Sequence, residues 1–96
     1  MKPREKQTFI DLYAGCGGLS LGLMQAGWTG LFAVEKSKDA FQTLSHNLCG
    51  DNSKYKFQWP DWFPCKSEST SQVLKNYSSQ LKKLKGEVDL IAGGPP

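Results

Sequence analysis

Apolar and polar residues alternate along the chain in blocks that predict strands and helices in turn. An apolar run at 8–13 leads into the glycine-rich segment 14–18, and leucines at 19, 21 and 23 continue beyond it. This order is typical of a strand, a tight turn and a helix, because glycine tolerates the positive φ that such a turn needs. We therefore expect a strand over about 8–13 and a well-buried helix over 19–26, which Gly27 ends.

The pattern continues through the middle of the chain. A second strand is expected over about 30–35, and a helix that Ser37 caps is expected to run to Leu48, with its apolar residues on one face. Tyr55, Phe57 and Trp59 alternate with polar residues, which favours a short third strand.

The last third of the chain predicts one more helix and one more strand. Ser69 and Gln72 are spaced as in a capping box, and an apolar stripe follows them as far as Gly86. The run Val88–Ala92 is typical of a buried strand.

Strands that alternate with helices predict an α/β fold with a parallel, doubly wound sheet. No helix follows the strand expected at 88–92, although a buried parallel strand needs cover on both faces. We therefore interpret residues 1–96 as a single partial domain, the N-terminal piece of something longer. We expect this piece to self-associate, or to be stabilised by the remaining polypeptide.

The turn at 14–18 is a candidate ligand site, because it lies at the carboxyl end of a strand and before the unpaired N–H groups of a helix. Gly15 and Gly17 fit the first two glycines of G-x-G-x-x-G, but Ser20 occupies the third position. Glu35 ends the second expected strand, where a carboxylate can accept hydrogen bonds from two ribose hydroxyls. The pattern favours a nucleoside cofactor without a pyrophosphate, such as S-adenosylmethionine, over a plain turn beside a surface glutamate.

Composition limits the partners and the cellular location that we expect. The net charge of +3 permits a polyanionic partner without requiring one. Cys16, Cys49 and Cys65 cannot all pair within the chain, which favours a reduced, intracellular location, in cytoplasm or nucleoid if the protein is bacterial. No apolar run is long enough to span a membrane, so no membrane association is expected. His46 is interpreted as a solvated helix residue, and no metal site is expected.

Three segments carry a resemblance to a known family. FIDLYAGCGGLSLGL, AVEKSKDAF and VDLIAGGPP resemble, in this order, three segments of the DNA cytosine-5 methyltransferases. The resemblance implies the N-terminal part of a Rossmann-like, S-adenosylmethionine-dependent methyltransferase fold with a mainly parallel sheet. It also implies methyl transfer to C5 of cytosine, as in restriction-modification systems, with double-stranded DNA bound through parts of the enzyme beyond this chain.

The resemblance assigns roles to particular residues. In it, Glu35 matches the acid that binds the ribose, and Asp61 is the best match for the acid that meets the adenine amino group. The cofactor-binding residues that it implies are Tyr13, Ala14, Gly15, Cys16, Gly17, Gly18, Glu35, Asp61 and Pro96.

The catalytic cysteine of the family is expected directly after Pro96, so no catalytic residue is expected within the chain. Phe63-Pro64-Cys65 resembles a variant of that motif, but the residues before it make a poor buried strand. The strand at 88–92, in contrast, is followed by two glycines that leave room for a flipped base. We interpret Cys65 as a loop thiol.

Three functions remain to be weighed. The first is the cofactor half of a DNA cytosine-5 methyltransferase, inactive by itself. The second is a non-catalytic interaction module, either a remnant or one half of a split enzyme. The third is another enzyme with a nucleoside cofactor, such as a small dehydrogenase; the glycine spacing and the ending Gly93–Pro96 count against it. The sequence is equally compatible with the first two functions, so both stay open.

Overall fold

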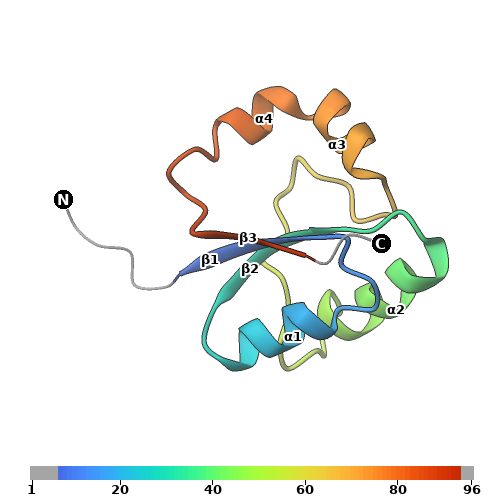
Figure 1. The fold of residues 1–96 in the computed structure, drawn as a ribbon. Coiled ribbons are helices and arrows are strands. Elements are labelled where there is room, and N and C mark those ends of the chain that lie inside the picture. Colours follow the sequence, from blue (N-terminus) through green and yellow to red (C-terminus); the bar gives the residue numbers. More distant parts are fainter. Residues whose placement is uncertain (1–6, 94–96) are drawn as a thin grey trace.

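The computed structural model describes residues 7–93 and shows a parallel sheet between two layers of helices (Figure 1). Helices α1 and α2 cover one face of the sheet, and α3 and α4 lie on the other. The α/β fold and the parallel sheet are confirmed. Within 7–93, no helix is both long enough and apolar enough to cross a membrane. The elements are β1 (Thr8–Leu12), α1 (Gly18–Gln25), β2 (Thr29–Val34), α2 (Lys38–Leu48), α3 (Thr70–Asn76), α4 (Ser78–Lys82) and β3 (Leu90–Ala92).

The strand order β2-β1-β3 puts the first strand in the centre of the sheet. Leu12 of β1 pairs with Val34 of β2, and Asp11 pairs with Ala92 of β3. Because all three strands are parallel, the segments that follow them leave the sheet at the same edge. Strand β2 lies on one side of β1 and β3 lies on the other, so the strand order reverses at β1. Open α/β sheets bind ligands at such a reversal, outside the carboxyl ends of the strands.

Each face of the sheet has its own hydrophobic cluster, because successive strand residues point to opposite faces. Phe9 and Ala33 pack with α1 and α2, whereas Ile10, Phe32 and Val34 pack toward α3 and α4. The first cluster is completed by Ala14, Met24, Phe41, Leu44, Leu48 and Phe57, and the second by Phe63 and Val73.

The strand expected at Tyr55–Trp59 is wrong, since this segment belongs to a long connection between α2 and α3. Its alternation is nevertheless physical: Phe57 packs in the first cluster, and Trp59 contacts both. The N–H of Gln58 donates to the carbonyl of Gly30 in β2 at 2.8 Å. Pro60 then follows and has no N–H to extend a ladder. The segment therefore covers the outer edge of β2 without becoming a strand.

The predicted helix starts are confirmed, but one helix is divided. Ser37 caps α2 by accepting the N–H of Ala40 at 3.3 Å, and Ser69 and Gln72 form the capping box of α3. The helix expected to reach Gly86 breaks at Tyr77, which has a φ of −127°. The ring of Tyr77 packs edge-on against Phe63, with centroids 5.1 Å apart. The break therefore coincides with packing onto the loop beneath the helix.

Two elements are less buried than the sequence predicts. In α1 the buried residues are Ser20 and Met24, whereas Leu19 is 49% exposed. Strand β3 is shorter than expected, and Ile91 is 64% exposed. Apolar character alone therefore overstated the burial of both elements.

Candidate functional site

Glu35 directly follows β2 and is held by the backbone on both sides. Its Oε1 accepts the N–H of Gly15 and its Oε2 accepts the N–H of Ser37, each at 2.8 Å. An ionised carboxylate has about four acceptor positions. The two backbone donors therefore orient the carboxylate and leave one position on each oxygen for a ligand.

The turn after β1 has the positive φ angles that its glycines predict. Gly15 and Gly17 have φ of 59° and 97°, and Tyr13 has φ of 55° although it carries a side chain. Such a conformation costs a non-glycine residue roughly 1–3 kcal/mol, and strain of this kind concentrates at ligand sites.

Packing inside the protein favours glycine at position 17. A Cβ at this position would lie 2.8 Å from Cδ1 of Leu48. The glycine therefore allows α2 to approach the turn, which is a different reason from ligand approach. A substitution at Gly17 would disturb α2 and could not test ligand binding by itself.

Asp11 and Ser20 join β1 to α1 beneath the turn. Both are buried, and the Ser20 hydroxyl donates to Oδ2 of Asp11. Burial raises the pKa of the Asp11 carboxyl; the bond from Ser20 lowers it and the charge of Glu35 raises it. Oδ1 has no hydrogen-bond partner among the described residues. The pair fixes where α1 begins, and hence the path of the turn.

A pocket of about 380 Å³ opens beside Glu35. One wall comes from the segments that follow β1 and β2, and the other from the start of α3. The Tyr13 hydroxyl lies 3.5 Å from Oγ1 of Thr70 across the pocket. The lining residues are Tyr13, Val34, Glu35, Lys36, Glu68, Ser69, Thr70 and Ser71.

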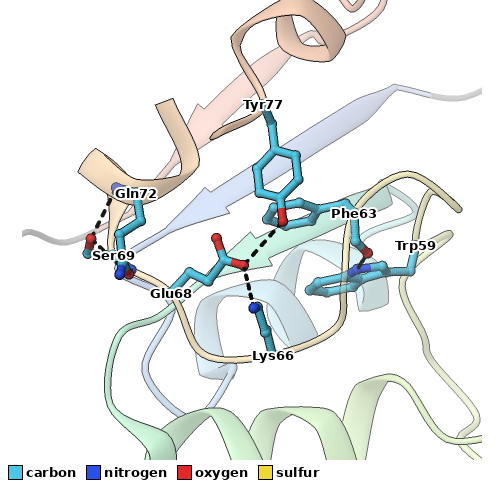
Figure 2. A network of polar contacts seen from close by, with 7 residues as sticks. All are labelled: Trp59, Phe63, Lys66, Glu68, Ser69, Gln72 and Tyr77. Carbon is cyan, nitrogen blue, oxygen red and sulfur yellow. Dashed lines mark hydrogen bonds and ion pairs between the residues drawn. The ribbon is translucent and has the colours of Figure 1, made fainter. Parts of the chain in front are cut away.

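Glu68 is an acid that the sequence analysis missed. It is 7% exposed, and its N–H donates to the carbonyl of Glu35 at 2.9 Å. Figure 2 shows Oε1 between the Tyr77 hydroxyl, at 3.5 Å, and Nζ of Lys66, at 3.8 Å. Oε2 is buried and, among residues 7–93, has no hydrogen-bond partner. The sequence offered one signal for Glu68: it directly precedes Ser69, the residue that caps α3.

Glu68 also affects Tyr77. Partial burial raises the pKa of the Tyr77 phenol, and the charge of Glu68 and the hydrogen bond to it raise this pKa further. Tyr77 therefore stays a neutral donor to Glu68 at ordinary pH. The pocket thus contains two carboxylates, Glu35 and Glu68, which are both held in place by neighbouring groups.

The structure brings some predicted site residues together and separates others. Tyr13 and Glu35 line the pocket, and Gly15 reaches Glu35 through its N–H. Ala14 is buried, and its N–H donates to Val34. Cys16, Gly17 and Gly18 line a separate hollow of about 440 Å³ beside Lys54 and Tyr55. Asp61 is exposed and does not line the pocket. Pro96 lies outside the described residues.

Cys65 does not follow a strand. It is exposed in the connection between α2 and α3, with its Sγ 4.0 Å from Oγ of Ser45 in α2. The end of β3 has a different setting: a Cβ on Gly93 would lie 1.9 Å from the carbonyl oxygen of Leu12. The room that Gly93 leaves is therefore filled by the backbone of β1.

Comparison with known proteins places this chain in a family. The model of the family described as C-5 cytosine-specific DNA methylase matches residues 7–96. The type II methyltransferase M.DdeI of Desulfomicrobium norvegicum is 37% identical over 93% of the chain and 18% of its own length. The type II methyltransferase M.HgiGI of Herpetosiphon aurantiacus is 37% identical over 91% of the chain and 56% of its own length.

A third relative shows the same likeness. The DNA (cytosine-5)-methyltransferase PliMCI of Paracentrotus lividus is 33% identical over 98% of the chain and 6% of its own length. The chain thus spans between a sixteenth and just over half of these three relatives. It aligns with them over nearly its whole length, and its fold is consistent with the N-terminal Rossmann-like region of a methyltransferase. The chain therefore belongs to the C-5 cytosine-specific DNA methylase family.

Proposed function

We propose that this chain is the cofactor-binding portion of a DNA cytosine-5 methyltransferase and binds S-adenosylmethionine in the pocket beside Glu35. Bound there, the cofactor would supply the methyl group for C5 of cytosine in double-stranded DNA. The residues that would hold it are Tyr13, Glu35 and Glu68. The DNA would be bound by protein outside residues 1–96.

One observation carries the proposal: the orientation of the Glu35 carboxylate. Two backbone donors at 2.8 Å fix its plane, and its free acceptor positions lie at the carboxyl edge of the sheet. A ribose presents two neighbouring hydroxyl donors, which match two acceptor oxygens. The relatives are named methyltransferases, which supports a ribose-containing methyl donor, S-adenosylmethionine, as the ligand of this pocket.

We propose that Glu68, rather than Asp61, is the acid that meets the adenine amino group. A buried carboxylate oxygen without a partner favours a ligand donor, because an unpaired buried acceptor costs about 1–3 kcal/mol. An exocyclic amino group of adenine is such a donor. We propose that Oε2 of Glu68 accepts it, while Tyr77 and Lys66 hold Oε1.

The chain by itself is proposed to be inactive. Cys65 is an exposed loop residue that lines no part of the pocket beside Glu35. The alternative is a non-catalytic interaction module, which is either a remnant or one half of a split enzyme that needs a second chain. Methyl transfer restored by a second polypeptide would favour the split enzyme, and cofactor binding without restorable activity would favour the module.

Replacing Glu35 by glutamine should weaken binding of S-adenosylmethionine by about 10- to 100-fold. The amide has one acceptor oxygen, so it faces one of its two backbone donors with an N–H₂ group and loses a charge-assisted bond to the ribose. Isothermal titration of the purified chain measures the effect. Asp39→Asn is the matched control, since it removes the same charge from the exposed first turn of α2. Equal affinities of wild type and Glu35→Gln would contradict the assignment.

Glu68 and Asp61 can be separated by the same titration. Glu68→Gln should weaken binding about 5- to 10-fold, because a neutral acceptor replaces a charged one at the adenine amino group. Asp61→Asn should leave affinity unchanged. A cofactor analogue with oxygen in place of the amino group sharpens the test. Wild type should discriminate against the analogue and Glu68→Gln should lose this discrimination; retained discrimination would exclude Glu68.

A further inference from the structure

Three small polar side chains meet at the carboxyl end of α2, outside the pocket described above. Ser45 lies in the last turns of the helix, and the N–H of Cys49 donates to its carbonyl at 3.0 Å. Oγ of Ser45 and Sγ of Cys65 are 4.0 Å apart. Cys49 follows Ser45 by one helical turn, and the Cys65 thiol and the Ser45 hydroxyl both lie close enough to shift the pKa of the Cys49 thiol. Two cysteines that are distant in the sequence are therefore close together in the fold, both beside Ser45.

The backbone on each side of the two cysteines is anchored. Next to Cys49, the carbonyl of Leu48 accepts the N–H of Phe57 at 2.9 Å. Next to Cys65, Phe63 is buried, and its carbonyl accepts the Trp59 indole N–H at 2.7 Å (Figure 2). The thiols are thus held near each other by the fold, and little further conformational entropy is lost when they are joined.

The two thiols differ in access. Cys65 is exposed and borders a hollow of about 440 Å³, through which a small reagent can reach its sulfur. Cys49 is half-buried against the first hydrophobic cluster. Burial first, and then the neighbouring Cys65, raises the pKa of the Cys49 thiol to about 12. Cys65 is therefore the residue that meets a reagent from solution.

We propose that Cys49 and Cys65 are a reversible disulfide site that reacts with low-molecular-weight disulfides such as oxidised glutathione. The Cys65 thiolate attacks one sulfur of the oxidant, which forms a mixed disulfide and releases one glutathione thiolate. The Cys49 thiol then loses its proton and its sulfur attacks the Cys65 sulfur, which forms the protein disulfide and releases the second glutathione thiolate. The protein loses two electrons and two protons, and the oxidant becomes two molecules of reduced glutathione.

The bond would connect α2 to the segment that leads into the pocket. Only Lys66 and Ser67 separate Cys65 from Glu68, whose N–H is hydrogen-bonded to Glu35. Oxidation would therefore fix the segment that carries Glu68 to the end of α2. The disulfide itself does not depend on which ligand the pocket binds.

The test is oxidation of the purified chain with oxidised glutathione, followed by alkylation of free thiols, digestion and mass spectrometry. We expect a covalent monomer in which the Cys49 and Cys65 peptides are linked, and in which the exposed Cys16 is alkylated or carries glutathione. Closure of this loop should raise the midpoint of thermal unfolding by about 10 °C, and reduction should reverse the rise. The linked form should also arise at least about tenfold faster in buffer than in 8 M urea, because folding brings the thiols together.

Variants identify the partners. Cys16→Ser should retain both the linked peptide and the thermal shift, whereas Cys65→Ser and Cys49→Ala should each lose both. Cys65 is exposed, so its replacement is compatible with folding. Stable glutathione on Cys65 with Cys49 still open to alkylation would overturn the proposal. So would a bond to Cys16, dimers as the main product, or equal rates in buffer and urea.

Discussion

Replacing Gly93 by alanine is expected to separate β3 from β1 and to lower the free energy of unfolding by about 2–6 kcal/mol. Gly93 has a φ of 145°, which a residue with a side chain rarely adopts. The added Cβ would lie 1.9 Å from the carbonyl oxygen of Leu12, and backbone cannot rotate away as a side chain can. Because β1 is the central strand, the loss is comparable with the whole stability of a small domain.

A matched variant separates the collision from the backbone strain. Gly86 also has a positive φ, 85°, but a Cβ there would meet no atom within 4 Å. Gly86→Ala should cost only about 1–2 kcal/mol, from the backbone strain alone. Urea denaturation measures both variants, and amide exchange at Asp89, whose N–H donates to Thr8 at 3.1 Å, reports the pairing of β3. Equal losses of stability in the two variants would show that the contact with Leu12 has no role.

The part of the site that sequence predicts well is local. The turn at 14–18 follows directly from its glycines, and Glu35 follows from the end of an apolar run. Parallel strands then place both at one edge of the sheet without any further information. The hydrogen bond between Gly15 and Glu35 is therefore the expected result of two short patterns that the fold brings together.

The other wall of the pocket depends on contacts that no local pattern reveals. Glu68 arrives at the end of a long connection whose course is set by aromatic packing, so the sequence led to Asp61 as the best match and gave Glu68 no role. The role of a glycine was also ambiguous. Gly17 and Gly93 allow close approach, but the approaching groups are Leu48 and the backbone of Leu12. A sequence shows that space is needed, and only the fold shows which atoms fill it.

Truncating Phe32 to alanine is expected to lower the free energy of unfolding by about 3–5 kcal/mol, because a large buried ring is replaced by a cavity. Phe32 is 1% exposed in β2. Its ring centroid is 4.6 Å from that of Phe63, 5.9 Å from Trp62 and 6.3 Å from Trp59. The connection between α2 and α3 therefore packs against the Phe32 ring through its aromatic residues.

The consequence should extend to the pocket, since the same connection delivers Glu68. Below the unfolding temperature, Phe32→Ala should loosen this segment, change the near-ultraviolet circular dichroism of the tryptophans and weaken the proposed cofactor binding. Phe32→Leu retains most of the volume and should cost less than about 1.5 kcal/mol. Leu74→Ala, at an exposed position in α3, should change neither stability nor the tryptophan signal appreciably. If Phe32→Ala kept the wild-type tryptophan signal and affinity, the aromatic cluster would not be what positions Glu68.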